Sequence, residues 1–440
     1  MRTVKSTAMA EPQGPCMVHG AQYAIDAIKL ALILLHSPPG CQTLPIAVSA
    51  MSVGKGLQMR NSLLVDNDVI FGAQEKLKKY IAQADHMYHP SLIAVLNSCA
   101  SQTIGEDIED VVEFMRPEVE AKLIAVPTCG YEGKVIDGYN MTFEKLVNDI
   151  MEEPEQKAEN QVNVVGWFRD DAHFEEAKRL LGELGLKVGT GLTAGSTLEG
   201  LQKAPQAALN VILAEPSALV CCQLMEDRFG VPYAGADEMT PYGFEATAAW
   251  LRAVARAVGA EAKAEEVIAK EWAEAKAALE ALNGDFKGKR VLIEGGAELA
   301  VGMTNFACEL GMEPVAVGIS SGASEKSLEL LEKIVQEKGI DPTVYPDINL
   351  TDVQNELLKS SVDLVLGGTS WVLAYYAERY NATLVPVAYP MAPIRPPGSG
   401  SYLGFKGIPV LAKDIQVGLE KKGKLMVEQF EKRIRSKTRT

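Results

Sequence analysis

The stretch Ser91-Leu-Ile-Ala-Val-Leu-Asn-Ser-Cys99 decides the predicted fold of this chain. Its apolar run ends at Leu96, has the length of a buried strand, and is followed at once by a turn that carries a cysteine. A helical pattern from Ile104 to Phe114 comes next, and a second apolar run, Lys122 to Val126, follows that helix. Strands that alternate with helices in this way predict a parallel sheet covered by helices on both faces.

The same alternation extends over all 440 residues. The polar stretch 151–161 is predicted to be a linker, and a second strand–helix series begins after it. A helix rich in Ala, Glu and Lys, residues 261–282, precedes a third series that starts with the strand 290–294. At roughly 150 residues per domain, this predicts an α/β fold of three Rossmann-like, doubly wound parallel-sheet domains. Their predicted limits are residues 1–150, residues 151–286 with the long connecting helix, and residues 287–440 with the C-terminal tail.

Three cysteines, Cys16, Cys41 and Cys99, each stand beside small or turn-forming residues at the edge of an apolar run. Cys16 follows a Gly-Pro pair and precedes residues 17–35, where apolar residues recur at the spacing of one continuous helix. Pro38-Pro39-Gly40 is predicted to end that helix and to present Cys41. The three side chains therefore come from three separate loops, as the ligands of one shared site would.

Two interpretations of these thiols are open at this point. Thiolates bind iron and hold clusters of iron and sulfide. The nearby glycine and proline residues would let the backbone approach such a cluster and direct N–H groups at its sulfur atoms. The alternative is that all three are buried structural cysteines, because free cysteine is among the most buried residue types.

The remaining cysteines differ in their surroundings. Cys129 follows a predicted strand, and either it or the neighbouring Thr128 could be an additional cluster ligand in one redox state. The alternative for Cys129 is a buried loop thiol. Cys221, Cys222 and Cys308 lie in apolar, helix-like segments and are predicted to belong to the core.

The five histidines all lie within the first 173 residues. His19 and His36 flank the cysteine loops, where they could hydrogen-bond a cluster sulfur or serve as ordinary structural histidines. His86 and His89 are three residues apart, but Pro90 ends the element and no carboxylate pattern supports a metal pair. No chemistry is assigned to four carboxylates near predicted helix starts: Asp66, Asp68, Glu106 and Asp107.

The composition is that of a soluble globular protein, with 47% hydrophobic residues, 23% charged residues and a net charge of −15. So acidic a chain is not expected to have a broad nucleic-acid-binding surface. No apolar run reaches the length of a membrane span and residues 1–10 lack the core of a signal peptide, so no membrane association and a cytoplasmic location are predicted. In that compartment the seven cysteines are expected to be ligands or buried thiols rather than disulfides. The sequence has no P-loop, so the chain is not expected to hold ATP.

The cysteine loops resemble those of the β-type subunit of nitrogenase component 1 and its relatives. The intervals, 25 residues from Cys16 to Cys41 and 58 residues from there to Cys99, are similar to the β-type pattern. The resemblance extends over nearly the whole chain and favours ligand cysteines over structural ones. Four further stretches resemble landmarks of the same family: Asp66–Gln74, Cys99–Asp107, Tyr242–Thr247 and Gly288–Gly295.

The resemblance implies an α-type catalytic partner subunit in an α2β2 heterotetramer, and a separate ATP-hydrolysing iron protein with a 4Fe-4S cluster that delivers electrons. It implies that Cys16, Cys41 and Cys99 are the metal and cofactor ligands of an iron-sulfur cluster shared with the α-type subunit. This cluster is of the 8Fe-7S P-cluster type or a 4Fe-4S cluster. The substrate-reducing cofactor is expected in the partner, where a cysteine and a late histidine hold it, because this chain has no histidine after His173. The chain is thus expected to transfer electrons, with no catalytic residue of its own.

Two departures from the family pattern bear on the substrate. Residues 389–398 contain no histidine, where the nitrogenase β subunit has a histidine-rich segment, and residues 36–40 replace the usual glycine–serine–glutamine–glycine sequence. These departures favour the β-type subunit of a nitrogenase-like methylthio-alkane reductase, which cleaves C–S bonds reductively, over a dinitrogen-reducing nitrogenase. Two further functions stay open: a scaffold subunit for nitrogenase cofactor assembly, and a tetrapyrrole reductase subunit of the same superfamily.

Overall fold

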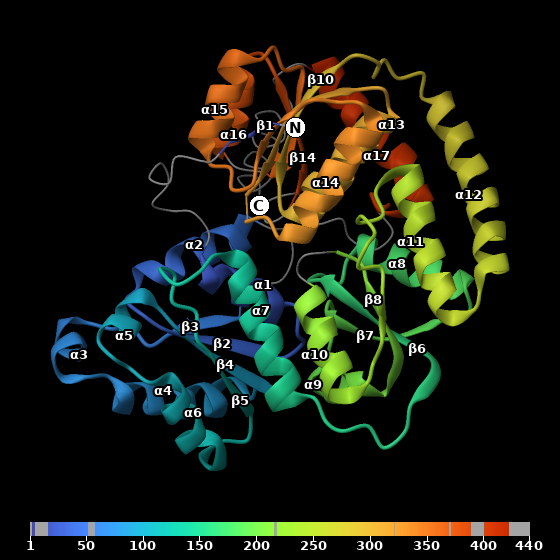
Figure 1. Ribbon diagram of the computed structural model, residues 1–440. Coiled ribbons are helices and arrows are strands. Elements are labelled where there is room, and N and C mark those ends of the chain that lie inside the picture. Colours follow the sequence, from blue (N-terminus) through green and yellow to red (C-terminus); the bar gives the residue numbers. More distant parts are fainter. Residues whose placement is uncertain are drawn as a thin grey trace, which may run out of the picture. The chain divides into compact units, whose positions relative to one another are not determined.

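The computed structural model describes residues 2–4, 16–51, 58–214, 218–320, 322–368, 371–388 and 400–421. The chain divides into two compact units (Figure 1). The cysteine unit comprises Pro15–Asp170 and Gly185–Ala236, and the C-terminal unit comprises Met1–Gly14, Asp171–Leu184 and Asp237–Thr440. The histidine-free stretch 389–398 and most of residues 1–10 lie outside the described residues.

Both units are built from alternating strands and helices. The elements of the cysteine unit are, in chain order, α1 (Met17–Asp26), β2 (Ala31–His36), α2 (Gly40–Met51), β3 (Met59–Asn61), α3 (Asp66–Phe71), α4 (Gln74–Tyr88), β4 (Leu92–Asn97), α5 (Cys99–Thr103), α6 (Ile108–Met115), η1 (Arg116–Glu118), β5 (Lys122–Val126), α7 (Val135–Lys145), η2 (Leu146–Ile150), β6 (Ala158–Trp167), β7 (Lys187–Thr193), α9 (Leu198–Gln202), η3 (Ala204–Gln206), β8 (Ala207–Ile212), α10 (Leu219–Phe229) and β9 (Tyr233–Ala234). Those of the C-terminal unit are β1 (Arg2–Thr3), α8 (Ala172–Glu183), α11 (Gly243–Val258), α12 (Glu261–Ala281), β10 (Arg290–Gly295), α13 (Ala297–Glu309), β11 (Glu313–Ile319), α14 (Glu325–Lys338), β12 (Thr343–Tyr345), α15 (Leu350–Lys359), β13 (Leu364–Gly368), α16 (Trp371–Arg379), β14 (Thr383–Ala388) and α17 (Gly404–Lys421).

The strands form three parallel sheets. The cysteine unit contains two four-stranded sheets, in the orders β3-β2-β4-β5 and β7-β6-β8-β9. The C-terminal unit contains one six-stranded sheet, in the order β1-β12-β11-β10-β13-β14. The predicted α/β class with three Rossmann-like parallel sheets is confirmed, whereas the predicted domain limits at residues 150 and 286 stay a prediction. Within the described ranges, no helix combines the length and the apolar character needed to cross a membrane.

Helices cover both faces of the first sheet (Figure 1). Alternate residues of β2 divide between two cores: Ile33 and Leu35 belong to the core that includes residues of α1 and α7, and Leu32 and Leu34 to the core that includes residues of α4 and α6. All six residues of β2 are buried, and so are all six of β4. This burial on both faces explains why these strands are continuous apolar runs in the sequence.

The prediction of one helix over residues 17–35 is wrong. α1 ends at Asp26, Leu30 has a positive φ of 59°, and the chain then continues as strand β2. The periodicity of a short, fully apolar run does not distinguish a buried helix from a buried strand. Parallel pairing with β3 and β4 makes this run a strand.

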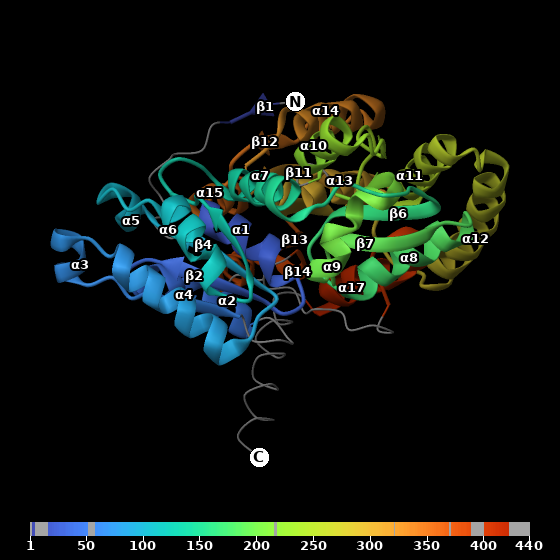
Figure 2. The same ribbon diagram turned by 90° about the horizontal axis from the view of Figure 1, so that it is seen from below.

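α1 and α7 pack against each other (Figures 1 and 2), and each has a glycine at the contact. A Cβ on Gly20 would lie 2.0 Å from the carbonyl oxygen of Val135, and a Cβ on Gly138 would lie 2.1 Å from that of Met17. A side chain at either position would therefore push the helices apart. Because Cys16 is the N-cap of α1, this contact also fixes the position of that cysteine.

In the C-terminal unit, α8 packs against α12 and α17. Arg179 of α8 donates four hydrogen bonds of 2.6 to 2.8 Å, two to Glu176 and two to Glu271 of α12. Burial opposes the charge of Arg179, but the two carboxylates outweigh this effect and raise its pKa above the usual value. The network anchors α8 to α12, whose bounds, Glu261–Ala281, agree with the helix predicted over residues 261–282.

Glu309, the last residue of α13, supports the start of α11. Its carboxylate accepts the N–H groups of Phe244 and Glu245 at 2.7 and 2.8 Å, which are among the donors left unpaired at a helix start. Burial raises the pKa of Glu309 to about 7 in spite of these bonds.

The raised pKa of Glu309 makes the stability of the chain depend on pH. Between the ordinary value of 4.5 and about 7, the folded chain holds a proton on Glu309 that the unfolded chain has released. The free energy of unfolding therefore falls as the pH rises through this window, by up to about 3 kcal/mol for this group. In Glu309→Gln this part of the fall is expected to disappear, as measured by urea unfolding at pH values across the window. The exposed Glu313→Gln is the control, and an unchanged pH dependence in Glu309→Gln would contradict the assignment.

Candidate functional site

Three adjacent strands of the first sheet end at one edge, and each is followed by a loop or helix start that carries a cysteine. β2 leads to Cys41, β4 to Cys99 and β5 to Cys129. Because β2, β4 and β5 are parallel neighbours, their carboxyl ends lie together, at the edge where α/β sheets form binding sites. Cys16 reaches the same edge through an antiparallel bridge to Lys134, which follows β5.

The sulfur atoms of Cys16 and Cys99 both lie close to Gly130. A Cβ on Gly130 would be 3.3 Å from Cys16 Sγ and 3.2 Å from Cys99 Sγ, so the two sulfur atoms are at most 6.5 Å apart. The Cys41 thiol is close enough to both of them for their charges to affect its ionisation, and Cys129 is similarly close to Cys99. The structure thus brings the three predicted site residues to one place.

All three predicted ligands lie at the starts of helices. Cys16 is the N-cap of α1, Cys41 is the second residue of α2, and Cys99 is the first residue of the short α5. The positive end of a helix favours a thiolate over a thiol.

The exposure of these thiols separates them from core cysteines. Cys41 and Cys99 are exposed and Cys16 is half-buried. Cys221 and Cys222, in contrast, are fully buried in α10, as predicted for core residues. Exposure of this kind is unusual for structural cysteines and typical of thiols that react or bind.

Two of the three thiols, those of Cys16 and Cys41, have a pKa above the ordinary value and are protonated at neutral pH. Burial raises the pKa of Cys16, although the N–H groups of Val18 and His19 oppose this effect. Burial also raises the pKa of Cys41, and the neighbouring Cys99 and Cys16 raise it further. A cationic metal centre held by these residues would reverse this balance, because its charge would outweigh the repulsion among thiolates, and its binding would release protons.

Thr128 and Cys129, the two residues considered as additional ligands, have different surroundings. The Thr128 hydroxyl is fully buried and donates to the carbonyl oxygen of Asn97 at 2.8 Å. Cys129 is also buried, and its thiol interacts with Tyr131 and with Cys99. Thr128 therefore joins β5 to the end of β4, while Cys129 lies beside the other thiols.

The donor set consists of thiols, whose chemistry suits an iron-sulfur cluster. Among the residues that the structure describes, no group of three or more His, Cys, Asp or Glu side chains is arranged to hold a single metal ion. Thiolates are the usual protein ligands of iron-sulfur clusters, and here they come from three separate loops. Gly130 lets the backbone come close to such a cluster, because a Cβ there would press on two of the sulfur atoms.

His19 is placed to orient Cys16. Its Nδ1 accepts the backbone N–H of Cys16 at 3.3 Å and lies 3.7 Å from the sulfur atom. Burial lowers the pKa of His19 to about 4, so the ring is neutral at neutral pH. With Nδ1 as the acceptor, the proton is on Nε2, for which the described part of the chain provides no hydrogen-bond partner.

His36 is turned toward Ser62 and Glu106. Its Nδ1 lies 2.7 Å from Ser62 Oγ, and its Nε2 lies 3.6 Å from Glu106 Oε2. The position of Glu106 in the sequence predicts an ordinary carboxylate at a helix start, but the residue that caps α6 is Asp107. No local pattern signals the contact between His36 and Glu106, since they are far apart in the sequence.

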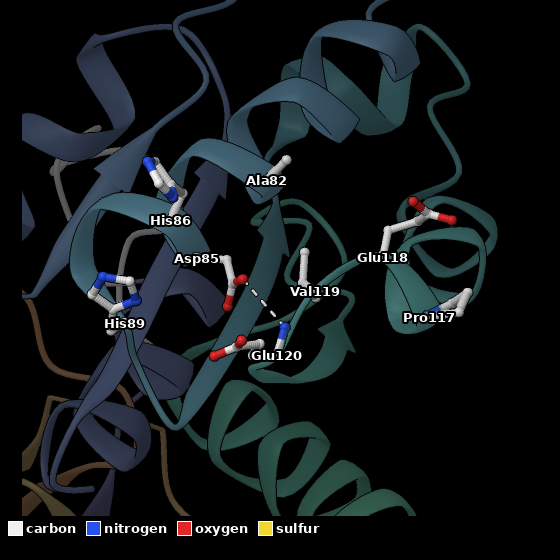
Figure 3. Close-up of a pocket in the computed structure, with 8 residues that line it drawn as sticks. All are labelled: Ala82, Asp85, His86, His89, Pro117, Glu118, Val119 and Glu120. Carbon is white, nitrogen blue, oxygen red and sulfur yellow. Dashed lines mark hydrogen bonds between the residues drawn. The ribbon is translucent and has the colours of Figure 1, made fainter.

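A surface pocket lies beside α4, and among the described residues it holds no group of side chains arranged to bind a metal ion. Its volume is about 450 Å³, and Figure 3 shows its lining: Ala82, Asp85, His86, His89, Pro117, Glu118, Val119 and Glu120. The Asp85 carboxylate accepts the N–H groups of Glu120 and Ala121 at 3.2 and 3.0 Å, so it holds the start of β5 in place. The rings of His86 and His89 do not point at a common centre with the carboxylates (Figure 3).

The match to a known family agrees with this geometry. Residues 16–420 match the model of the family described as nitrogenase component 1 type oxidoreductase. The chain therefore belongs to the nitrogenase component 1 family of oxidoreductases.

Curated relatives are similar over most of their length. The chain is 28% identical to the nitrogenase iron-molybdenum cofactor biosynthesis protein NifE of Clostridium pasteurianum, with 81% of this chain and 78% of that protein covered. It is also 28% identical to the nitrogenase molybdenum-iron protein alpha chain of Methanococcus maripaludis, with 91% and 85% covered. These relatives are an alpha chain and a cofactor biosynthesis protein, so the β-type assignment stays a prediction.

A solved structure has the same fold. The chain matches the structure described as nitrogenase Cp1 at pH 6.5 with a TM-score of 0.83, at 22% identity and with 95% of each chain covered. At this level of identity the match establishes the fold alone.

The space around Gly130 can be tested by filling it. In Gly130→Ala the added Cβ meets two sulfur atoms, so the affinity for iron after anaerobic reconstitution is expected to fall about tenfold or more. Gly182→Ala is the control, because a Cβ there has no atom within 4 Å. Wild-type iron binding by folded Gly130→Ala would show that the cluster does not lie against this glycine.

Proposed function

We propose that this chain is the electron-relay subunit of a nitrogenase-like two-component reductase. Cys16, Cys41 and Cys99 hold an iron-sulfur cluster, of the 8Fe-7S P-cluster type or 4Fe-4S, at the boundary with an α-type subunit. An ATP-hydrolysing iron protein supplies the electrons, and a metallocofactor in the α-type subunit receives them. When bound, the cluster supplies one-electron transfer.

The observation that carries the proposal is the gathering of three thiols at one edge of the first sheet, with two of them exposed. Exposed ligands suit a cluster that is completed by cysteines of a second subunit. The chain's own residues supply the rest: α1 and α2 direct their positive ends at Cys16 and Cys41, and Gly130 leaves space beside the sulfur atoms. His19 holds the backbone of Cys16 in position.

The cysteine unit also offers a surface to a partner protein. The 62–73 segment, which connects β3 to α4, contains five exposed large apolar side chains: Leu63, Val65, Val69, Ile70 and Phe71. Its helix α3 lies at the same edge of the unit as α5, which begins with Cys99 (Figures 1 and 2). Exposed apolar patches mark sites of protein association, and in this proposal the iron protein docks here.

For the substrate we propose methylthio-alkanes, whose C–S bonds the complete enzyme cleaves reductively, with this chain as the β-type subunit of an α2β2 heterotetramer. The support is in the sequence: residues 389–398 lack histidine, and residues 36–40 depart from the usual sequence before Cys41. The lack of any histidine after His173 supports a substrate-reducing cofactor in the partner rather than in this chain.

A second candidate is a scaffold subunit on which a nitrogenase cofactor is assembled. It is favoured by the names of relatives: the proteins from Clostridium pasteurianum and from Nostoc, 28% and 26% identical, are both cofactor biosynthesis proteins NifE. The two functions differ in what happens to the bound cluster, since a relay subunit retains it through turnover and a scaffold transfers it.

The relay function predicts that cluster and activity are lost together. Cys41→Ala removes one thiolate, so the anaerobically purified complex is expected to lose most of its cluster iron and its electron transfer, measured by metal analysis and by reductase assay. Cys308→Ala, at a half-buried thiol of α13, is the matched control and should keep both. Full activity in Cys41→Ala would refute the relay function, and transfer of the wild-type cluster to an acceptor protein without substrate turnover would favour the scaffold.

A further inference from the structure

The 62–73 segment leaves the first sheet after β3 and leads into α4, and its two ends are both buried. Ser62 is fully buried and Ala73 is 2% exposed, whereas Phe71 between them is 83% exposed. The segment is therefore anchored at its ends and open to other molecules in its middle. The residues that hydrogen-bond its two ends determine which parts of the cysteine unit are affected when another protein contacts the exposed middle.

The start of the segment is tied to the end of β2 and to the helix that Cys99 begins. Ser62 Oγ lies 2.7 Å from Nδ1 of His36, the last residue of β2. The carbonyl oxygen of His36 in turn accepts the hydroxyl of Ser98 at 3.0 Å, and Ser98 is the N-cap of α5. His36 is thus in contact with the segment and with the residue next to Cys99.

Ser37 provides a second tie at the start of the segment. Its carbonyl oxygen accepts the N–H of Leu64 at 2.9 Å. Its hydroxyl accepts from the amide of Asn61 at 2.8 Å and interacts with the Cys41 thiol. Ser37 therefore connects Leu64 directly to Cys41, and a displacement of Leu64 is expected to move Cys41 as well.

The end of the segment is tied to Glu106. Gly72, with a φ of 86°, ends α3, and the N–H of Ala73 then donates to Glu106 Oε1 at 2.6 Å. Glu106 is 8% exposed, and its own N–H donates to the carbonyl oxygen of Ser101 in α5 at 3.0 Å. Glu106 thus holds the end of the segment, and its own backbone is hydrogen-bonded to α5, the helix that begins with Cys99.

His36, which holds the start of the segment, and Glu106, which holds its end, face each other. His36 Nε2 and Glu106 Oε2 are 3.6 Å apart, and neither atom has a hydrogen-bond partner within the part of the chain that the structure describes. When the Ser62 hydroxyl donates to Nδ1, the imidazole proton is on Nε2 and points at the carboxylate. An approach of about half an ångström converts this contact into a charge-assisted hydrogen bond.

We propose that His36 and Glu106 are a positioning pair that couples the 62–73 segment to the loops of Cys41 and Cys99. A protein that presses on the exposed apolar side chains displaces Ser62 and Ala73. The buried contact between His36 and Glu106 joins these two displacements to each other and to the cysteine loops. That the docking protein is the iron protein rests on the proposed function, but the coupling itself does not.

The test uses the full-length chain purified without metal. Glu106→Gln keeps an acceptor for the Ala73 N–H and removes the charge that faces His36. Amide hydrogen exchange in residues 63–72 is expected to become about tenfold faster, because the buried carboxylate charge that faces His36 Nε2 is lost. The rates at which Cys41 and Cys99 react with a maleimide are expected to change with it. His36→Gln should give both changes, and the double variant should add little, because the residues act as a pair.

Glu109→Gln is the matched control, because it removes the same charge from an exposed carboxylate of α6 that pairs with Lys145. Wild-type exchange in residues 63–72 of Glu106→Gln and His36→Gln would overturn the proposal, and so would faster exchange with unchanged thiol rates. If either variant fails to fold, Ser62→Ala, which removes only one tie, is measured in the same two ways. Because no metal is present, this result is independent of whether the proposed cluster binds.

Discussion

The parallel pairing of β2, β4 and β5 is the constraint on which the site depends. In a parallel sheet the carboxyl ends of neighbouring strands share one edge, so the segments that follow them start side by side. The register places His36 level with Asn97, and Leu96 level with Val126. The segments that carry Cys41 and Cys99 therefore begin at the same level of the sheet, and each cysteine follows within a few residues. A helix in place of β2 would remove Cys41 from this edge.

A second constraint, the packing of α1 against α7, brings Cys16 to the same edge of the sheet. The close contact of α1 with α7, made possible by Gly20 and Gly138, fixes the start of α1, and the bridge to Lys134 joins Cys16 to the loop after β5. Cys41 resists ionisation there, since burial and the neighbouring Cys99 and Cys16 all raise its pKa. An arrangement that is unfavourable for bare thiolates is suited to a cationic metal centre, which neutralises them.

Elements that are marked by a short continuous stretch of sequence could be predicted from the sequence alone. β4 and β5 are apolar runs bounded by turn residues, and the cysteines behind them could be assigned to strand ends from the sequence alone. β2 could not be recognised, because a continuous apolar run after α1 has no periodicity that favours a strand. The α/β class followed in spite of this error, because the alternation is repeated along the whole chain.

Contacts between distant segments were beyond sequence reasoning. Glu106 looks like any carboxylate near a helix start, and only the folded chain shows that Asp107 caps the helix while Glu106 reaches Ala73 and His36. Gly130 follows Cys129 directly, which hints at a close approach, but the sulfur atoms that need its missing side chain come from two other loops. The function of such residues depends on distances that no spacing in the sequence encodes.

Cluster binding is tested most directly by anomalous diffraction at the iron edge, on crystals of the chain purified anaerobically with its partner subunit. We predict iron atoms bonded to the sulfur atoms of Cys16, Cys41 and Cys99 within a single cluster at the subunit boundary. Iron bound elsewhere while these three sulfur atoms remain free, or a complex without iron, would contradict the account.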